Sequence, residues 1–223
     1  MKGYFIIMNG VIYRDIIKSD YETVKKLIGE AFGFSDFIKD KKLLDLALSG
    51  YLQECILDSS FSKVAEKDNQ VIGFILGSAK NDKNRISDSN GTLEFDMNSI
   101  ELMMNSKENQ FLFKEFSKIP ATYKELIEGK QEQFQGCIQL FVVSKESRGL
   151  GVGKTLIKYL SDYMKNMNVK SLYLFTDSRC NYGFYDSQNF NKLNEKEISF
   201  DYVNAKLDVF LYGYDFNPTI CKK

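Results

Sequence analysis

The chain has 223 residues, of which 43% are hydrophobic and 27% are charged, so it is long and apolar enough to bury a proper core. Its 30 lysines and arginines balance 30 aspartates and glutamates, which gives no electrostatic reason to expect nucleic acid or an anionic membrane as a partner. The absence of histidine excludes Ser-His-Asp and Cys-His catalysis, and four widely spaced cysteines without a CxxC pair argue against a metal site.

In the N-terminal part, a strand and two helices are expected in succession. Residues 11–17 read as the strand. Ser19, with Glu22 three residues later, has the spacing of a capping box and predicts a helix over 19–32. A second helix is expected to begin after position 35, within the range 35–57.

A hairpin and then a long insertion follow. Residues 63–67 and 70–78 are strand-like, and Asp68 and Asn69 between them tolerate the positive φ of a tight turn. Residues 81–133 break this pattern, with a polar loop at the start and short amphipathic helices expected at 100–104, 111–116 and 123–127.

The C-terminal half shows the strongest regularity, because a buried strand, a Gly-rich loop and an amphipathic helix follow one another. The expected elements are a strand at 136–143, a loop at 144–153, a helix at 154–167, a strand at 172–175, a helix at 181–188, and strands at 190–199 and 206–214. The order β-α-α-β-β-insertion-β-α-β-α-β-β predicts a mixed α/β fold.

The central motif is the loop Arg148-Gly149-Leu150-Gly151-Val152-Gly153 between that strand and that helix. Glycines let the backbone come close to an anion, and the free N–H groups and dipole of the following helix attract it. The motif lacks the first glycine of a Walker A loop and the third glycine of GxGxxG. The spacing Arg-x-x-Gly-x-Gly fits in full, which favours a phosphate or pyrophosphate ligand.

This spacing resembles the pyrophosphate loop of the GNAT (Gcn5-related N-acetyltransferase) superfamily. The run from Leu140 to Gly153 matches the family layout of a strand, the loop and a helix, with Lys145 where many members carry proline. The run from Phe184 to Phe190 is similar to the family's Phe-Tyr-Glu-Lys-x-Gly-Phe, with Asn189 at the glycine position. An asparagine suits that position if its backbone is left-handed.

The resemblance implies one α/β domain over 1–223, with a centrally splayed mixed sheet and a largely helical insertion between its third and fourth strands, at about 81–133. It also implies acetyl-CoA as co-substrate and no metal. On this resemblance the cofactor contacts are Phe141, Val142, Val143, Arg148, Gly149, Leu150, Gly151, Val152, Gly153, Lys154 and Asn181.

Tyr185 matches the family's tyrosine and is the candidate acid that protonates the departing thiolate. A plain core aromatic remains an alternative in a chain with 13 tyrosines and 18 phenylalanines. No base can be named, and Gln139, on the strand where some members carry Glu or His, cannot act as one.

The expected function is direct transfer of an acetyl group to a primary amine of a small molecule or peptide, in a cytoplasmic protein that has no nucleic-acid or membrane partner and could form a homodimer. A catalytically inactive CoA-binding sensor and a phosphate-loop nucleotide enzyme are the alternatives. The insertion is expected near the acceptor, where Glu94, Asp96 and Glu101 could attract a cationic amine. Its alternative role is a helical cap that adds core.

Overall fold

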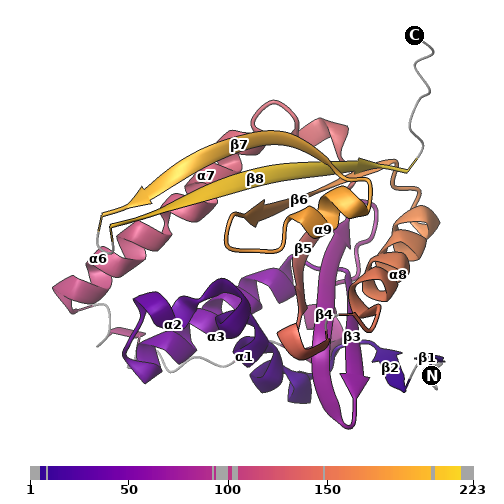
Figure 1. Cartoon of the computed structure of the whole chain (residues 1–223), viewed down its shortest axis with the longest axis horizontal. Helices are drawn as coiled ribbons and strands as arrows, with labels where there is room; N and C mark the ends of the chain where they lie inside the picture. Colours follow the sequence, from indigo (N-terminus) through magenta and orange to yellow (C-terminus); the bar gives the residue numbers. More distant parts are fainter. Residues whose placement is uncertain are drawn as a thin grey trace. The chain divides into compact units, whose positions relative to one another are not determined.

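The computed structural model describes residues 6–8, 10–91, 93, 100–101, 105–147, 149–201 and 204–216. The chain contains both strands and helices, interspersed along its length, so the predicted mixed α/β class is confirmed (Figure 1). The strands are β1 (Ile6–Met8), β2 (Val11–Arg14), β3 (Phe61–Lys67), β4 (Gln70–Ala79), β5 (Gly136–Val143), β6 (Ser171–Asp177), β7 (Asn191–Phe200) and β8 (Ala205–Asp215). The α-helices are α1 (Tyr21–Phe32), α2 (Phe34–Phe37), α3 (Lys41–Leu57), α4 (Ile86–Asn90), α6 (Lys107–Phe116), α7 (Lys118–Ile127), α8 (Val152–Asn166) and α9 (Gly183–Ser187). Short 3-10 helices lie at η1 (Lys18–Asp20), η2 (Gln131–Gln133) and η3 (Lys145–Ser147).

The chain divides into two compact units, each built from two separate stretches of sequence. The first unit comprises Met1–Leu93 and Gly136–Val169, and the second comprises Glu94–Gln135 and Lys170–Lys223. Each unit is described by itself below.

The sheet of the first unit runs β1-β2-β3-β4-β5, and every neighbouring pair is antiparallel. The hairpin between β3 and β4 turns at Asp68 and Asn69, whose φ angles are 52° and 61°. Lys67 pairs with Gln70 across the turn, so the predicted two-residue turn is confirmed.

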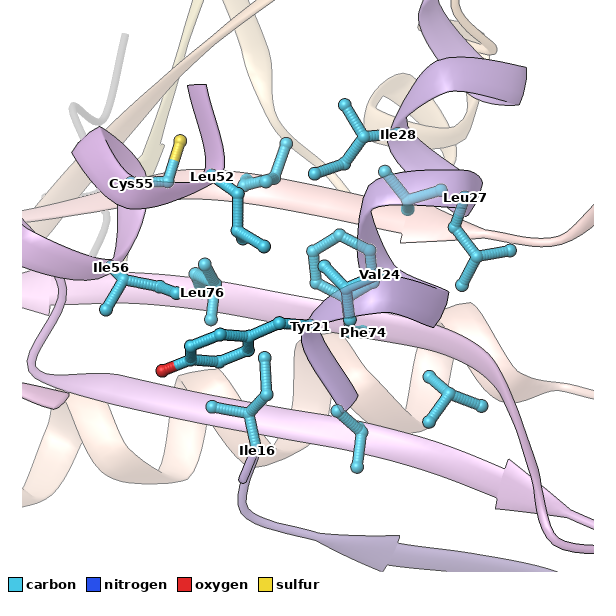
Figure 2. Packing of buried hydrophobic residues seen from close by; sticks show 14 of the residues in the cluster. Ile16, Tyr21, Val24, Leu27, Ile28, Leu52, Cys55, Ile56, Phe74 and Leu76 are labelled. Atoms are coloured by element: carbon cyan, nitrogen blue, oxygen red, sulfur yellow. The ribbon is translucent and has the colours of Figure 1, made fainter. Parts of the chain in front are cut away.

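Two faces of this sheet are covered by different helices. Side chains of α1 and α3 pack onto Phe74, Leu76 and other apolar residues of the strands, as Figure 2 shows. On β4 the next residue after Leu76 is Gly77, where an added Cβ would lie 2.7 Å from Leu160 Cδ1 of α8. Successive strand residues point to opposite faces, so α8 covers the face opposite α1 and α3.

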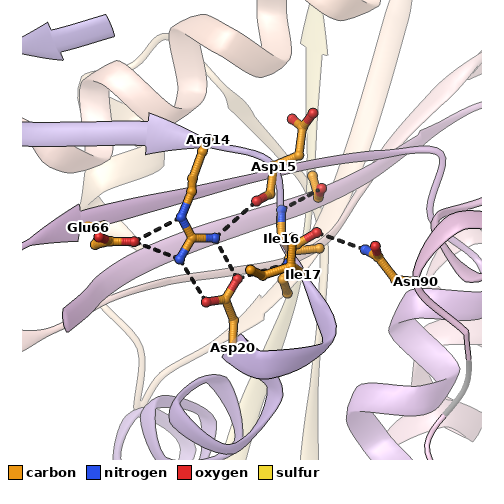
Figure 3. Close-up of polar contacts among 8 residues, drawn as sticks. Arg14, Asp15, Ile16, Ile17, Asp20, Glu66 and Asn90 are labelled. Atoms are coloured by element: carbon orange, nitrogen blue, oxygen red, sulfur yellow. Dashed lines mark hydrogen bonds and ion pairs between the residues drawn. The ribbon is translucent and has the colours of Figure 1, made fainter. Parts of the chain in front are cut away.

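The connection from β2 to α1 does not use the predicted capping box of Ser19 and Glu22. Asp20 takes that place: its carboxylate accepts the Ile17 N–H at 2.9 Å and binds the Arg14 guanidinium at 2.7 and 2.8 Å (Figure 3). Arg14 also donates from Nε to Glu66 at 2.8 Å. The capping-box prediction was wrong because it considered only neighbouring residues. The structure instead uses Asp20, which binds Arg14, and Arg14 in turn binds Glu66 on strand β3.

The second predicted helix begins later than expected. Within 35–57 the chain forms the short α2, leaves the helical conformation at Ile38 (φ −109°, ψ 107°), and starts α3 at Lys41. The Asp40 side chain caps α3 by accepting the Leu43 N–H at 2.8 Å. The end of α3 at Leu57 agrees with the prediction.

The second unit pairs β6 with β8 and β8 with β7, all antiparallel. Helix α7 lies along β7 and β8 (Figure 1). Its Leu126 and Ile127 are buried among Ile198, Val209 and Leu211 of those strands. Tyr123 stacks on Phe175 with ring centroids 4.2 Å apart. The described part of the insertion thus adds core, which is the helical-cap alternative.

Part of the predicted polar loop that opens the insertion is helical, because α4 occupies residues 86–90 and buries Ile86 in the first unit. Of the predicted helix over 100–104, only residues 100 and 101 are described, and both are helical. The remaining predicted strands and helices are all present, with ends that differ by a few residues. No helix among the described residues is long and apolar enough to cross a membrane.

Candidate functional site

Strand β5 leads into the Gly-rich loop, and its hydrogen-bond register with β4 decides which of its backbone groups point away from β4. The Ser144 N–H donates to the Ile72 carbonyl at 2.8 Å, so these two residues form a hydrogen-bonded pair at the end of the β4–β5 ladder. In antiparallel pairing such pairs alternate with non-bonded ones. The intervening pairs of Val143 with Gly73 and Phe141 with Ile75 are therefore non-bonded. The N–H and C=O groups of Phe141 and Val143 point away from β4.

Val142, between them, is placed differently. Its side chain is 5% exposed and lies in the core under α1 and α3, and its backbone faces Phe74 of β4. Phe141 and Val143 are the residues of this group whose main-chain polar groups are turned away from β4.

The loop after β5 is held by short contacts of its own. Residues 145–147 form η3, the Ser147 N–H donates to the Ser144 carbonyl at 3.1 Å, and the two serine hydroxyls lie 2.7 Å apart. The Leu150 N–H donates to the Ser147 carbonyl at 3.3 Å. These bonds fold the chain back so that it enters α8. Arg148 lies outside the described residues.

The two glycines of the turn need positive φ. Gly149 has φ 85° and Gly151 has φ 77°, a conformation that L side chains rarely adopt. At both residues, an added Cβ would meet no heavy atom within 4 Å. Glycine is therefore required at these two positions by the backbone conformation. The space that a side chain would occupy at each of them is open.

Helix α8 starts at Val152 without a side-chain cap, since its N-cap residue is Gly151. The first N–H groups of any helix lack partners within the helix, and here those of Val152, Gly153 and Lys154 are in that position. The first turn contains no acidic residue, and its charged residue, Lys154, is exposed. A cation here opposes the helix dipole, unless an anion binds between them.

The exposure of the loop residues varies. Leu150 is 40% exposed, Val152 is buried at 1%, and Gly153 is intermediate. The side chain of Val152 is therefore not available to a ligand. Gly149, Gly151 and Lys154 are exposed at this loop and helix start, an arrangement suited to an anion with more than one phosphate.

Tyr185 lies on α9 in the second unit, and its side chain is buried, with 8% exposure. Burial raises the pKa of Tyr185 above its ordinary value of 10.0, and the neighbouring Cys180 and Asp177 raise this pKa further. Its ring packs against Phe184, Phe190 and Tyr212. The hydroxyl is therefore neutral throughout the physiological pH range.

The rest of the tyrosine motif has the expected backbone. Asn189 has φ 63°, so the left-handed conformation expected at the motif's glycine position is confirmed. Asn181 is exposed, and its carbonyl accepts the Phe184 N–H at 3.1 Å at the entry to α9.

Gln139, whose amide cannot serve as a base, lies at an irregularity in the pairing of β5 with β4 that the sequence did not reveal. It is half-buried in β5, whose adjoining residues Ile138 and Leu140 are buried. The pairing register slips between Leu76 and Gly77 of β4, leaving Gln139 as an extra residue on β5. The one sequence feature that marks this irregularity is the presence of a glutamine in the middle of an apolar strand.

Other predicted site features are less informative. Glu101 is exposed, whereas Glu94 and Asp96 lie outside the described residues. The described ranges contain no group of three or more His, Cys, Asp or Glu side chains that could hold a metal ion.

The mixed α/β fold, with a Gly-rich loop that leads into a helix, also occurs in known proteins. Residues 104–190 match the family model described as "Acetyltransferase (GNAT) family". This part of the chain is therefore similar to a GNAT acetyltransferase domain, in agreement with the resemblance noted in the sequence. No curated protein sequence matches the chain significantly.

Solved structures share the fold at low sequence identity. An N-acetyltransferase from Staphylococcus aureus Mu50 has a TM-score of 0.54 at 13% identity, covering 93% of this chain and 99% of its own. The paia N-acetyltransferase from Thermoplasma acidophilum, solved in complex with coenzyme A, has a TM-score of 0.51 at 13% identity, covering 92% and 99%. A Bacillus anthracis chain in complex with acetyl coenzyme A matches at 18% identity and a TM-score of 0.42, and the match covers 71% of this chain and only 64% of that one.

Proposed function

We propose that this protein binds acetyl-CoA and transfers the acetyl group directly to a primary amine of a small molecule or peptide. The family match supports acetyl transfer in general. The observation that carries the proposal for this chain is the loop at Gly149 and Gly151, with positive φ at both glycines and an uncapped α8 directly after it.

In this proposal the pyrophosphate of coenzyme A binds the N–H groups at the start of α8. The donors come from Gly149, Gly151 and the first helical residues, and Lys154 and Arg148 add positive charge. Because Gly149 and Gly151 carry no side chain, phosphate oxygens can approach the backbone directly. The binding of coenzyme A by a structural relative is in keeping with this assignment.

The pantetheine arm is proposed to follow β5. The N–H and C=O groups of Phe141 and Val143, which point away from β4, are the groups proposed to bind the amides of the arm. A main-chain N–H directed at the thioester carbonyl would stabilise the negative charge that develops on its oxygen during attack. Asn181, four residues before Tyr185, is a further proposed contact of the arm.

Tyr185 is proposed to assist the departing thiolate. Its raised pKa keeps the phenol protonated, as a donor must be, but it also makes full proton transfer to a thiolate uphill, since a thiol has a pKa of about 8.5. We therefore propose that the hydroxyl acts chiefly by hydrogen bonding to the sulfur. The motif match supports this role.

The first experiment separates the proposal from its alternatives. We expect acetyl-CoA to raise the melting temperature of the protein and ATP to leave it unchanged, because the loop lacks the Walker A glycine. A turnover screen with acetyl-CoA against amines, polyamines, aminoglycosides, amino acids and peptides then follows. A shift with ATP alone would contradict the proposal, and a shift with acetyl-CoA but no turnover would favour the sensor.

A further inference from the structure

Helix α8 is anchored by hydrogen bonds at the end opposite the Gly-rich loop. Tyr163, in the last turn of α8, donates its hydroxyl hydrogen to Asp82 Oδ2 at 2.9 Å. The same hydroxyl oxygen lies 2.6 Å from the Ser60 hydroxyl, and the ring stacks on Phe61 with centroids 4.8 Å apart. Ser60 directly precedes β3 and Asp82 follows β4, so α8 is bonded to one end of the β3–β4 hairpin. Ser60, Tyr163 and Asp82 are called the α8 clamp below.

The direction of each hydrogen bond in the α8 clamp follows from the available donors. An ionised carboxylate only accepts, so the single hydroxyl hydrogen of Tyr163 goes to Asp82. Ser60 must then donate its own hydrogen to the Tyr163 oxygen. The Ser60 oxygen in turn accepts the Ala79 N–H at 3.1 Å. Each hydroxyl of the clamp therefore both donates and accepts, and the three side chains form one directed chain.

The carboxylate at the end of this chain is itself fixed in place. Its other oxygen, Asp82 Oδ1, accepts the main-chain N–H of Asn84 at 3.0 Å and the side-chain amide of Asn84 at 2.9 Å. The Arg85 guanidinium donates to the Asp82 carbonyl at 2.6 Å. Asp82 is also buried. The acceptor is therefore held rigidly, and it determines where the Tyr163 hydroxyl can lie.

Apolar contacts set the distance of α8 from the sheet. An added Cβ would lie 2.7 Å from Leu160 Cδ1 at Gly77, and 2.7 Å from Met164 Sδ at Gly136, so these glycines let the helix approach closely. Apolar attraction has no preferred direction, whereas a hydrogen bond weakens steeply when its distance or angle departs from the optimum. The α8 clamp is therefore the contact that fixes the helix most strictly along its own axis.

The start of α8 shares this axial position, because a helix moves along its axis as a unit. Val152 and Tyr163 are separated by about three turns, or ~16 Å. The preceding loop is tied instead to β4, through the Ser144 N–H that donates to the Ile72 carbonyl at 2.8 Å. Main-chain donors of the loop and of the helix start can therefore match one anion only while these two anchors keep their spacing.

We propose that Tyr163, held by Ser60 and Asp82, is a positioning residue for the pyrophosphate of coenzyme A and acts through the axial position of α8. This inference rests on the proposed function. The clamp raises affinity because the helix start already lies where the anion requires it, so binding does not have to order it. Burial raises the pKa of Tyr163 to about 12, so its hydroxyl remains a donor to Asp82 at physiological pH.

The test compares two serines at the start of β3. Ser60→Ala removes a clamp hydroxyl and the acceptor of the Ala79 N–H. Ser62→Ala, the matched control, removes the acceptor of the Ile16 N–H at 3.2 Å and leaves the clamp intact. Both variants should lower the Tm, because each leaves one main-chain N–H without its acceptor. Ser60→Ala should also weaken acetyl-CoA binding about tenfold, whereas Ser62→Ala should leave the Kd unchanged. Isothermal titration calorimetry measures the Kd.

Tyr163→Phe keeps the ring and removes the hydroxyl that links α8 to both partners, so it should also weaken binding about tenfold. Combined with Ser60→Ala it should cause no greater loss, because both changes break the same link. A wild-type Kd in Tyr163→Phe, multiplied losses in the double variant, or equal weakening by Ser60→Ala and Ser62→Ala would each overturn the inference. If Tyr163→Phe does not fold, the two serine variants decide alone. Failure of acetyl-CoA to bind the wild-type protein would instead overturn the proposed function itself.

Discussion

Two helices of the first unit begin in opposite ways. The carboxylate of Asp40 caps α3 by accepting the Leu43 N–H at 2.8 Å. Helix α8 begins at a left-handed glycine, Gly151, with no side-chain cap and with Lys154 in its first turn. The first arrangement completes the helix within the protein, whereas the second leaves main-chain donors and a positive charge for a ligand. The difference separates a helix start that stabilises the fold from one that is suited to binding an anion.

The largest expected effect comes from converting the start of α8 to the type found in α3. Gly151→Asp should weaken acetyl-CoA binding at least ~100-fold, because the new carboxylate occupies the helix N-terminus and repels the pyrophosphate. Isothermal titration calorimetry measures this loss. Gly129→Asp is the matched control, since Gly129 also has positive φ (73°) and open space where a Cβ would lie. It should bear the same backbone strain without loss of binding.

If α8 carries the binding, then removing the Tyr185 hydroxyl should affect only the chemical step. Tyr185→Phe is expected to lower kcat about 30-fold, less than the ~100-fold or more typical of full proton transfer, and to leave the Kd for acetyl-CoA unchanged. Steady-state kinetics with an amine from the turnover screen measures kcat. Because its pKa is raised above 10.0, Tyr185 should also cause no fall in rate below about pH 10. An unchanged kcat, where chemistry limits the rate, would make Tyr185 a core aromatic.

The charge in the first turn of α8 provides a smaller test. Lys154→Glu should weaken acetyl-CoA binding about tenfold, while the helix gains ~0.3–1 kcal/mol from a favourable interaction with its dipole. Lys158→Glu, one turn further along α8, is the control. Its effects on acetyl-CoA binding and on helix stability should both be smaller than those of Lys154→Glu. Binding of the Lys154 variant that equals wild type would remove this side chain from the proposed site.

The smallest effect is expected at the start of α3. Asp40→Ala should reduce the free energy of unfolding by about 1 kcal/mol and the Tm by ~2–4 °C, because the Leu43 N–H loses its acceptor. Asp40→Asn retains an acceptor and should lose less. In both variants the shift produced by acetyl-CoA should stay the same, and a diminished shift would show that the two helix starts are not independent.

The sequence predicted those features that depend on neighbouring residues. The loop and the start of α8 were found because glycine, spacing and helical periodicity are all local, and the left-handed turn at Asp68 and Asn69 was found for the same reason. Asn189 likewise shows the positive φ that its motif position requires.

The features that depend on distant strands were missed. Asp20 displaced the capping box at Ser19 because Arg14 links it to Glu66, which lies 52 residues away from that arginine. The bulge at Gln139 exists only in the register between β5 and β4, so periodicity along β5 alone could not reveal which face the amide reaches.

The division of the chain into interleaved units has a consequence during synthesis. Strand β4 pairs with β3 along one edge and with β5 along the other, and the second unit's first segment lies between β4 and β5 in the sequence. Translation at about 5–20 residues per second leaves β4 without its second partner, completed at Val143, for roughly 3–13 s. During that interval a nascent strand rich in apolar residues presents an open hydrogen-bonding edge, the feature that templates aggregation. The ribosome-bound intermediate, rather than the finished protein, is therefore where this fold most needs chaperones.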